Sequence, residues 1–189
     1  YSHSVAVTND NRLFTWGNNT NGQLGYSASF TSIAAGSSTT VVVRNDGSLW
    51  AWGYNQEGQL GIGSIAGTTH RSNPVQIGSL NNWKTAYKVY SSAFALDNTN
   101  KLYGWGENST GGIGDGTTIN RSSPVQIGSS SYTVVSGWDM NSNSIDTQGN
   151  LFAWGNAQYG QLTLPSGIIS RSAPVQIVPN YSLVIVSPV

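Results

Sequence analysis

Apolar and polar residues alternate along the chain with a period of two, in short runs separated by polar turn residues. The run VAV at 5–7 is followed by LFTW at 13–16, and VVV at 41–43 is followed by LWAW at 49–52. A period of two is typical of β-strands, and two such runs across a short turn predict a β-hairpin. No apolar stripe has helical spacing, and Gly, Asn and β-branched residues are frequent, so the sequence predicts an all-β chain.

Each predicted hairpin has a residue suited to a tight turn five positions before a tryptophan. These turn residues are Asn11, Gly47, Asn100 and Gly149. Glycine and asparagine adopt positive φ at low cost, which tight hairpin turns require. The turn residues therefore support the same four hairpins as the apolar pattern.

Two phrases recur along the chain at intervals of about 50 residues. The first contains a Trp-Gly pair and occurs as LFTWGNNTNGQLG at 13–25, LWAWGYNQEGQLG at 49–61, LYGWGENSTGGIG at 102–114 and LFAWGNAQYGQLT at 151–163. The second occurs as RSNPVQIG at 71–78, RSSPVQIG at 121–128 and RSAPVQIV at 171–178. A phrase copied at a fixed period encodes one supersecondary unit repeatedly, whereas an active site is one convergence of different groups.

Repeats of this kind, with one tryptophan each where neighbouring sheets pack, predict a β-propeller of four-stranded antiparallel blades. We expect a single propeller domain or fragment over 1–189, with about 3.5–4 blades. The expected repeats are approximately 1–35, 36–88, 89–137 and 138–189.

Other positions in the repeats carry more specific expectations. The prolines of the second phrase suit the first residue of an edge strand, since proline donates no ladder hydrogen bond. The arginines of the same phrase are expected to donate to carbonyls at the repeat junctions. The segment DMNSNSI at 139–145 is polar where an inner strand is expected, so this strand is expected to face solvent or a partner.

Charge is scarce, and this excludes several kinds of partner. Charged residues are 8% of the chain, against roughly 25% in an average soluble protein, and eight basic residues balance eight acidic ones. The basic residues are scattered, so no patch that follows nucleic-acid phosphates is expected. No apolar run approaches the ~20 residues of a membrane-spanning helix, and cysteine is absent. We therefore expect neither a nucleic-acid partner nor insertion into a membrane.

No arrangement of catalytic residues is recognisable. His3 and His70 are the two histidines, and neither has a nucleophile and an orienting group at a triad spacing. The glycine-rich segments have neither the lysine of a phosphate loop nor the alternating oxygen ligands of a calcium loop. The sequence therefore predicts no enzyme activity, no cofactor and no metal site. A propeller glycosidase with Glu57 and Glu107 stays open, since sequence does not give the separation of two carboxylates.

The copies of the first phrase differ most in the loop that follows each Trp-Gly pair. Loops on a rigid scaffold commonly carry recognition, and Tyr with Asn supplies contact area and adaptable hydrogen bonds. Such loops suit a protein or a glycan as partner. The candidate binding residues are Asn18, Tyr54, Glu57, Glu107, Asn156 and Tyr159.

The phrase WGYNQEGQLG at 52–61 resembles the Trp-Gly-x-Asn-x-x-Gly-Gln-Leu-Gly repeat of the regulator of chromosome condensation family. The segment GDGTTINRSSPVQIG at 114–128 is similar to the repeats of this kind in bacterial and bacteriophage surface or structural proteins. The resemblance implies rings of about seven blades, roughly twice the residues present here. The chain is then expected to be an excerpt of a longer chain, a partial ring that assembles with others, or a small ring closed by its C-terminal strand.

The resemblance and the uncharged surface together predict a non-catalytic structural or adhesive module of a virus particle, on its tail or capsid surface, or of a cell surface. The expected location is extracellular or on the virion, and the expected partners are proteins or glycans, including other copies of the chain and other virion proteins. A secreted protein-binding inhibitor is the alternative, because a relative in this fold family inhibits a β-lactamase. Guanine-nucleotide exchange, the activity of the family's founding member, is disfavoured because basic arms for DNA are missing.

Overall fold

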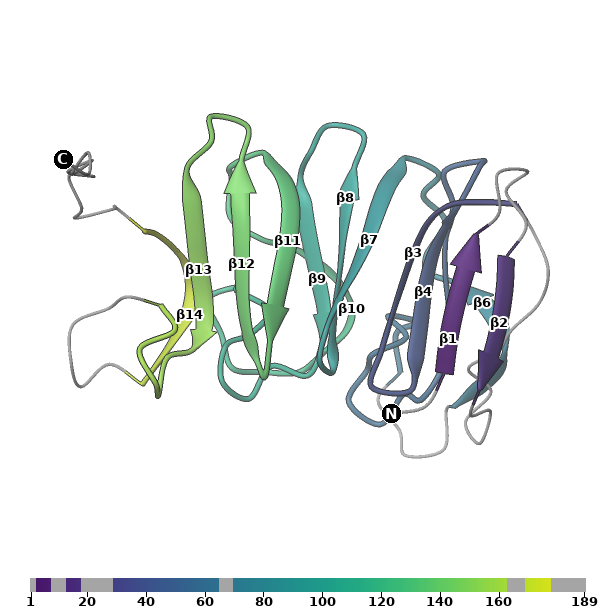
Figure 1. The fold of residues 1–189 in the computed structure, drawn as a ribbon, viewed down its shortest axis with the longest axis horizontal. Coiled ribbons are helices and arrows are strands. Elements are labelled where there is room, and N and C mark those ends of the chain that lie inside the picture. Colours follow the sequence, from purple (N-terminus) through teal and green to yellow (C-terminus); the bar gives the residue numbers. More distant parts are fainter. Residues whose placement is uncertain (1–2, 8–12, 18–28, 65–69, 163–168, 178–189) are drawn as a thin grey trace, which may run out of the picture.

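The computed structural model of the chain describes residues 3–7, 13–17, 29–64, 70–162 and 169–177. These residues form three four-stranded antiparallel sheets and one two-stranded sheet, with no helix among them. We number the sheets as blades 1 to 4 along the chain (Figure 1). Blade 1 contains β1 (His3–Val7) and β2 (Leu13–Gly17).

The three complete blades have the following strands. Blade 2 contains β3 (Phe30–Gly36), β4 (Thr39–Arg44), β5 (Leu49–Gly53) and β6 (Arg71–Gln76). Blade 3 contains β7 (Trp83–Val89), β8 (Ser92–Asp97), β9 (Leu102–Gly106) and β10 (Arg121–Gln126). Blade 4 contains β11 (Tyr132–Trp138), β12 (Asn141–Asp146), β13 (Leu151–Asn156) and β14 (Ser170–Gln176).

Each complete blade is a meander, because its strands pair in chain order. The first strand of a blade therefore lies at one edge of its sheet and the fourth strand at the other. The first strands are neighbours in space, since β7 contacts β3 on one side and β11 on the other (Figure 1). The predicted all-β fold of packed four-stranded blades is confirmed, with three complete blades and two strands of another in the described part.

The sheets and the expected sequence repeats are out of phase by one strand. The expected repeat 36–88 contains β4, β5, β6 and most of β7, whereas the sheet of blade 2 runs from β3 to β6. The first strand of each complete blade therefore comes from the end of the preceding repeat. Neighbouring repeats are joined in this way by the hydrogen bonds of one sheet.

The tryptophans of the Trp-Gly pairs in blades 2 to 4 are fully buried between blades, as expected. Trp52, Trp105 and Trp154 are each 0% exposed. Nε1 of Trp105 donates to the carbonyl of Gln59 in blade 2 at 3.0 Å, and Nε1 of Trp154 donates to the carbonyl of Gly112 in blade 3 at 2.8 Å. A buried tryptophan removes on the order of 150–250 Å² from water, so this side chain and its hydrogen bond fix each blade to the preceding one.

The last glycine of the first phrase makes room for this tryptophan. A Cβ added to Gly61 would lie 2.8 Å from Nε1 of Trp105, and a Cβ added to Gly114 would lie 2.6 Å from Nε1 of Trp154. Both distances are well inside van der Waals contact. In the fourth copy this position is Thr163, which lies outside the described residues. The recurring GQLG ending is therefore explained by packing between blades.

The expected hairpin turns are confirmed where they are described. Gly47, Asn100 and Gly149 have φ values of 78°, 62° and 86°. Asn11 lies outside the described residues. The positive φ explains why these positions carry glycine or asparagine.

The prolines of the second phrase lie on edge strands, but the expectation that each is the first residue of its strand is wrong. Pro74 and Pro124 lie inside β6 and β10, and Pro174 lies inside β14. In β10 the pairing register shifts between Arg121 and Val125, on either side of the proline, and the other two strands shift at the same place. A β-bulge leaves a residue outside the ladder, so proline loses no hydrogen bond there.

The polar strand β12 is central in its sheet, and its two faces differ. Ser142 and Ser144 are buried, and the hydroxyl of Ser142 donates to the carbonyl of Gly112 in blade 3 at 2.9 Å. On the other face Ile145 is 40% exposed and Asn143 is half-buried. The residue of blade 3 that matches Asn143 is Phe94, which is buried. Among the described residues Ser142, Ser144 and Asp146 of this strand are buried, so the expectation that the strand faces solvent holds only for the face of Asn143 and Ile145.

Candidate recognition rim

The strand directions divide the molecule into two rims. Because neighbouring strands are antiparallel, the ends of the first and third strands of each blade lie on one rim, and the ends of the second and fourth strands lie on the other. We call the first the loop rim, because it carries the loops after the Trp-Gly pairs, at the lower edge of Figure 1. The opposite edge is the hairpin rim, which carries the turns at Gly47, Asn100 and Gly149.

The loops of blades 2 and 3 on the loop rim are each held from within by one buried asparagine. Oδ1 of Asn108 accepts from the backbone N–H of Ile113 at 2.9 Å, and its Nδ2 donates to the carbonyl of Thr117 at 3.1 Å. Asn55 does the same in blade 2, with a backbone donor at 2.9 Å and a backbone acceptor at 3.1 Å. Blade 4 has Ala157 at this position, so the loop of blade 4 lacks the asparagine.

Tyr54, a candidate binding residue, is stacked on His70 at the start of the blade 2 loop. The ring centroids are 4.7 Å apart and the planes differ by 18°. Nδ1 of His70 accepts from the backbone N–H of Asn55 at 3.1 Å, which fixes the imidazole. The Tyr54 hydroxyl donates to the side-chain oxygen of Gln56. Tyr54 is half-buried in this arrangement, and one face of its ring is covered by His70.

The candidate residues Glu57 and Glu107 both accept hydrogen bonds within the protein. Oε2 of Glu57 accepts from Nδ2 of Asn120 at 2.6 Å, which ties the loop of blade 2 to the loop of blade 3. Glu107 is 9% exposed, and its Oε1 accepts from the backbone N–H of Ser109 at 2.9 Å. The two carboxylates therefore hold loops in place.

The candidate residues of blade 4 differ from each other in exposure. Oδ1 of Asn156 accepts from the backbone N–H of Gln158 at 2.9 Å, so this side chain shapes its own turn. Tyr159 is 78% exposed. The remaining candidate, Asn18, lies outside the described residues.

Three exposed side chains on the loop rim did not stand out in the sequence. Trp138 is 77% exposed, Ile119 is 63% exposed and Tyr90 is 37% exposed. The pairing register aligns Trp138 with Val89 in blade 3, which is buried. No sequence signal distinguishes Trp138, since Trp50 and Trp83 also lie outside the Trp-Gly pairs and Trp83 is buried.

The arginines of the second phrase make different contacts in different blades. Nη1 of Arg71 is 3.5 Å from the carbonyl of His70, in line with the expected carbonyl contact. Nε of Arg121 instead pairs with Oδ2 of Asp115 at 2.6 Å. Burial would raise the pKa of Asp115, but hydrogen bonds from Thr117 and Arg121 outweigh it and hold that pKa below its usual value. This ion pair supports the blade 3 loop.

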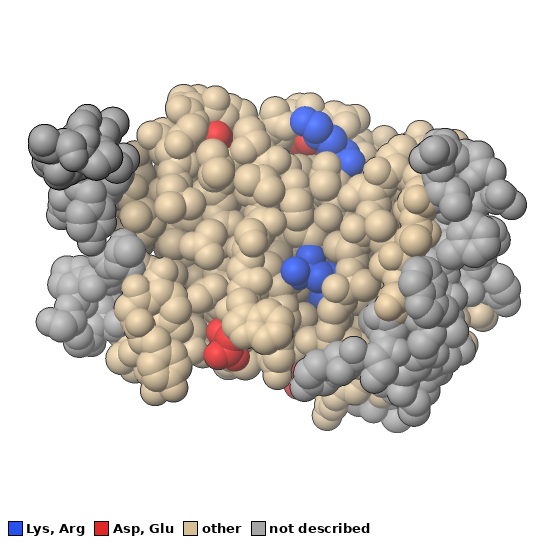
Figure 2. Space-filling view, in the orientation of Figure 1, with Lys and Arg blue, Asp and Glu red and all other residues tan. Residues whose placement is uncertain are grey.

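Charge is thinly spread over the surface. Figure 2 shows isolated basic and acidic groups on a face that is otherwise uncharged, without a basic patch in its described part. Among the described residues, no group of three or more His, Cys, Asp or Glu side chains is placed to hold a metal ion. The same residues include no helix that is long and apolar enough to cross a membrane.

Four-stranded meanders packed side by side, with loops of varied sequence on one rim, define a segment of a β-propeller. Two family models, both described as the regulator of chromosome condensation (RCC1) repeat, match the chain. One matches residues 1–23 and 30–59, and the other matches residues 46–91 and 99–139. The chain belongs to the regulator of chromosome condensation repeat family.

The similar proteins are longer than this chain. The ultraviolet-B receptor UVR8 of Arabidopsis thaliana is 35% identical over 78 residues, which are 39% of this chain and 18% of that protein. The structure of human WBSCR16 matches 94% of this chain and 52% of its own, with a TM-score of 0.84 and 17% identity. The structure of Prp20p from Saccharomyces cerevisiae matches 95% of this chain and 49% of its own, with a TM-score of 0.81 and 18% identity. The chain thus spans about half the length of these solved structures.

Proposed function

We propose that this chain is a non-catalytic recognition module that binds the surface of another protein through its loop rim. The observation that carries the proposal is the exposure of two large aromatic side chains on the blade 4 part of this rim. Trp138 is 77% exposed and Tyr159 is 78% exposed. Aromatic side chains of this kind are enriched among the residues that dominate the binding energy of protein interfaces.

The loops of blades 2 and 3 on the same rim are held in place before any partner binds. The internal bonds of Asn55 and Asn108, and the bond between Glu57 and Asn120, order the loops of blades 2 and 3. An ordered surface loses less conformational entropy on binding than a loose one. With few charges on the rim, shape and hydrogen bonds would select the partner.

A protein partner agrees with the binding properties of one protein of similar structure. The structure of yeast Prp20p is described together with its binding properties to Gsp1p and histones. At 18% identity this likeness concerns the fold alone, so we take from it only the general point that a protein of this fold binds other proteins.

For the location we propose the surface of a virus particle or a cell, outside the cytoplasm. The support is compositional: charged residues are 8% of the chain, and its polarity comes chiefly from Gly, Ser, Thr and Asn. In that setting the partner is another component of the same surface, another copy of the chain, or a protein or glycan of a host or neighbouring cell. A secreted inhibitor would use the same rim against a soluble protein.

The proposal is tested by retention of partners on the immobilised chain. Wild type, Trp138→Ala and Tyr159→Ala are exposed separately to surface and cytoplasmic fractions of the source. Leu80→Ala is the matched control, because Leu80 is 53% exposed and lies between β6 and β7 on the hairpin rim. We expect one stoichiometric protein from the surface fraction, with affinity reduced by about 2 kcal/mol, or ~30-fold, in each rim variant and unchanged in the control.

Two results would overturn this proposal. One is that Leu80→Ala weakens retention of the partner as much as the rim variants do. The other is the absence of any stoichiometric protein from either fraction. A partner that comes from the cytoplasmic fraction, with the same dependence on the rim residues, would support the recognition rim and contradict the proposed location.

A further inference from the structure

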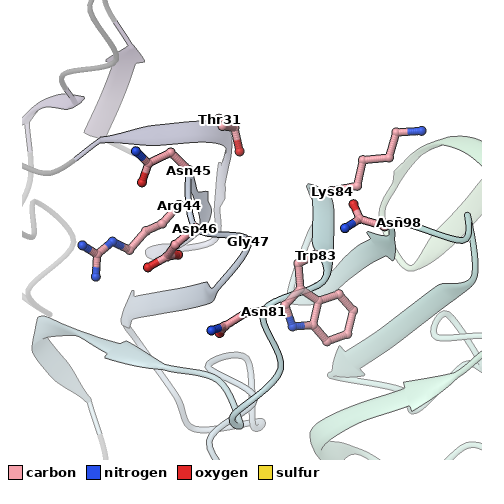
Figure 3. Close-up of a pocket in the computed structure, with 9 residues that line it drawn as sticks. All are labelled: Thr31, Arg44, Asn45, Asp46, Gly47, Asn81, Trp83, Lys84 and Asn98. Atoms are coloured by element: carbon pink, nitrogen blue, oxygen red, sulfur yellow. The ribbon is translucent and has the colours of Figure 1, made fainter.

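A cavity of about 400 Å³ opens on the hairpin rim between blades 2 and 3. It is bounded by the β4–β5 turn, by the link that enters β7, and by Asn98 in the β8–β9 turn (Figure 3). We call it the junction cavity. It lies on the rim opposite the loop rim, so its role is separate from the proposed protein recognition.

Trp83 lies in the wall of the junction cavity with an unsatisfied hydrogen-bond donor. Its side chain is 4% exposed, and Nε1 is buried with no acceptor among the described residues. In Figure 3 the indole nitrogen is on the edge of the ring turned toward Asn81, another residue that lines the cavity. The buried indoles of Trp105 and Trp154 both donate to carbonyls, so Trp83 differs from these two buried tryptophans. A buried polar group without a partner is costly, and a bound ligand would supply the missing acceptor.

The other polar groups of the junction cavity offer both donors and acceptors. Asn45, Asn81 and Asn98 line it with exposed side-chain amides. Asp46 adds a carboxylate, and the hydroxyl of Ser48 is the leading cause that holds the pKa of Asp46 below its usual value. This carboxylate is therefore an ionised acceptor at neutral pH.

The two cations of the cavity wall are directed away from its centre. The guanidinium of Arg44 lies over the ring of Trp50, 5.2 Å from the centroid. Nζ of Lys84 donates to Oδ1 of Asn100 at 2.9 Å. Figure 3 shows these two side chains pointing to opposite sides. The interior is thus lined by amides, one carboxylate and one indole N–H.

We propose that the junction cavity binds a neutral saccharide residue. A sugar hydroxyl both donates and accepts, so it satisfies the carboxylate of Asp46, the indole N–H of Trp83 and the asparagine amides together. The Asp46 carboxylate repels an anionic ligand, and with Arg44 and Lys84 flanking the cavity the summed charge of its lining residues does not attract a cation. Trp83 is the one large apolar side chain among the described lining residues, so a peptide would find no pocket for its side chains. The volume lies within the range of small-ligand pockets.

The test follows the indole N–H resonances of the full chain by NMR during titration with methyl glycosides of glucose, galactose, mannose and N-acetylglucosamine. Trp83→Phe assigns the Trp83 signal among the seven tryptophans and removes the donor. We expect at least one glycoside to shift the Trp83 resonance in a saturable way. Its affinity should fall about tenfold in Trp83→Phe, measured from the backbone amides of the cavity wall.

A second variant keeps the test informative if Trp83→Phe is poorly folded. Asn98→Ala removes one cavity amide, and Asn143→Ala is the matched control on the outward face of β12. Binding should weaken in the first and be unchanged in the second. The proposal is overturned if no glycoside moves the Trp83 resonance, or if binding survives both cavity variants. It is also overturned if acetate or a capped dipeptide shifts this resonance and the glycosides do not.

Discussion

Replacing Lys88 with methionine should stabilise the protein. Lys88 lies on β7 and faces β3, where Gly36 is so close that an added Cβ there would be 3.6 Å from Cβ of Lys88. The residue as a whole is half-buried, but Nζ is buried and has no acceptor among the described residues. Lys88→Met keeps a long unbranched side chain and removes the amine.

The size of the effect follows from the pKa of Lys88. Burial lowers this pKa to about 7 in the folded protein, whereas an unfolded lysine has a pKa of about 10.4. At 1.36 kcal/mol for each pKa unit, the amine reduces the free energy of unfolding by at most about 4 kcal/mol at neutral pH. The unfolded chain holds the proton more tightly, so the penalty is complete below about pH 7 and is relieved as the pH rises toward about 10.4.

The assay is urea unfolding of wild type and Lys88→Met, followed by tryptophan fluorescence over a range of pH. The difference in unfolding free energy should favour the variant by as much as about 4 kcal/mol near pH 7 and should shrink toward about pH 10. Lys84→Met is the control, because Lys84 is exposed and bonded to Asn100, and we expect it to change stability by less than about 0.5 kcal/mol. A Lys88→Met protein that is no more stable than wild type, or whose advantage is independent of pH, would show that the buried amine does not destabilise the fold.

Three further predictions concern packing, the unsatisfied indole and acid stability. Gly114→Ala should lower the free energy of unfolding by about 2–4 kcal/mol, because the new Cβ collides with an indole. Gly116 has a similar φ of 86° and open space around it, so Gly116→Ala should cost only about 1 kcal/mol. Thermal melts compare the stabilities of the two variants. Trp105→Phe should cost about 1 kcal/mol more than Trp83→Phe in chemical denaturation, because only Trp105 loses a hydrogen bond; equal losses would contradict the unsatisfied donor. The lowered pKa of Asp115 contributes stability above its ordinary pKa of 3.8 that is lost as the pH falls through the folded value, so unfolding curves of wild type and Asp115→Asn should converge in acid.

The blade structure was predictable because local and repeated signals agreed. Alternating runs, glycine or asparagine at the turns and a tryptophan in each copy all indicate the same hairpins, and the structure has them at Gly47, Asn100 and Gly149. The place of Pro74 inside its strand was not predictable, since a β-bulge depends on the pairing of two strands. The offset between repeats and sheets was not predictable for the same reason, because it too depends on which strands pair.

The site was less predictable, because exposure and partners arise from contacts between distant residues. The loop residues Glu57 and Glu107 were chosen for their variability, and the structure places both carboxylates in hydrogen bonds that support loops. Asn120, the partner of Glu57, is 63 positions away in the sequence. Trp138 was missed because the end of a first strand is buried where the next blade packs against it, as β11 of blade 4 packs against Val89 in blade 3.

Binding of a protein to the loop rim can be located along the chain. The most direct measurement is amide hydrogen exchange of the chain, free and in complex with the protein it retains. We expect slower exchange around Trp138 and Tyr159 on the loop rim, and unchanged exchange at the hairpin turns of Gly47 and Asn100. Protection confined to the hairpin turns, with the loop rim unchanged, would contradict binding at the loop rim.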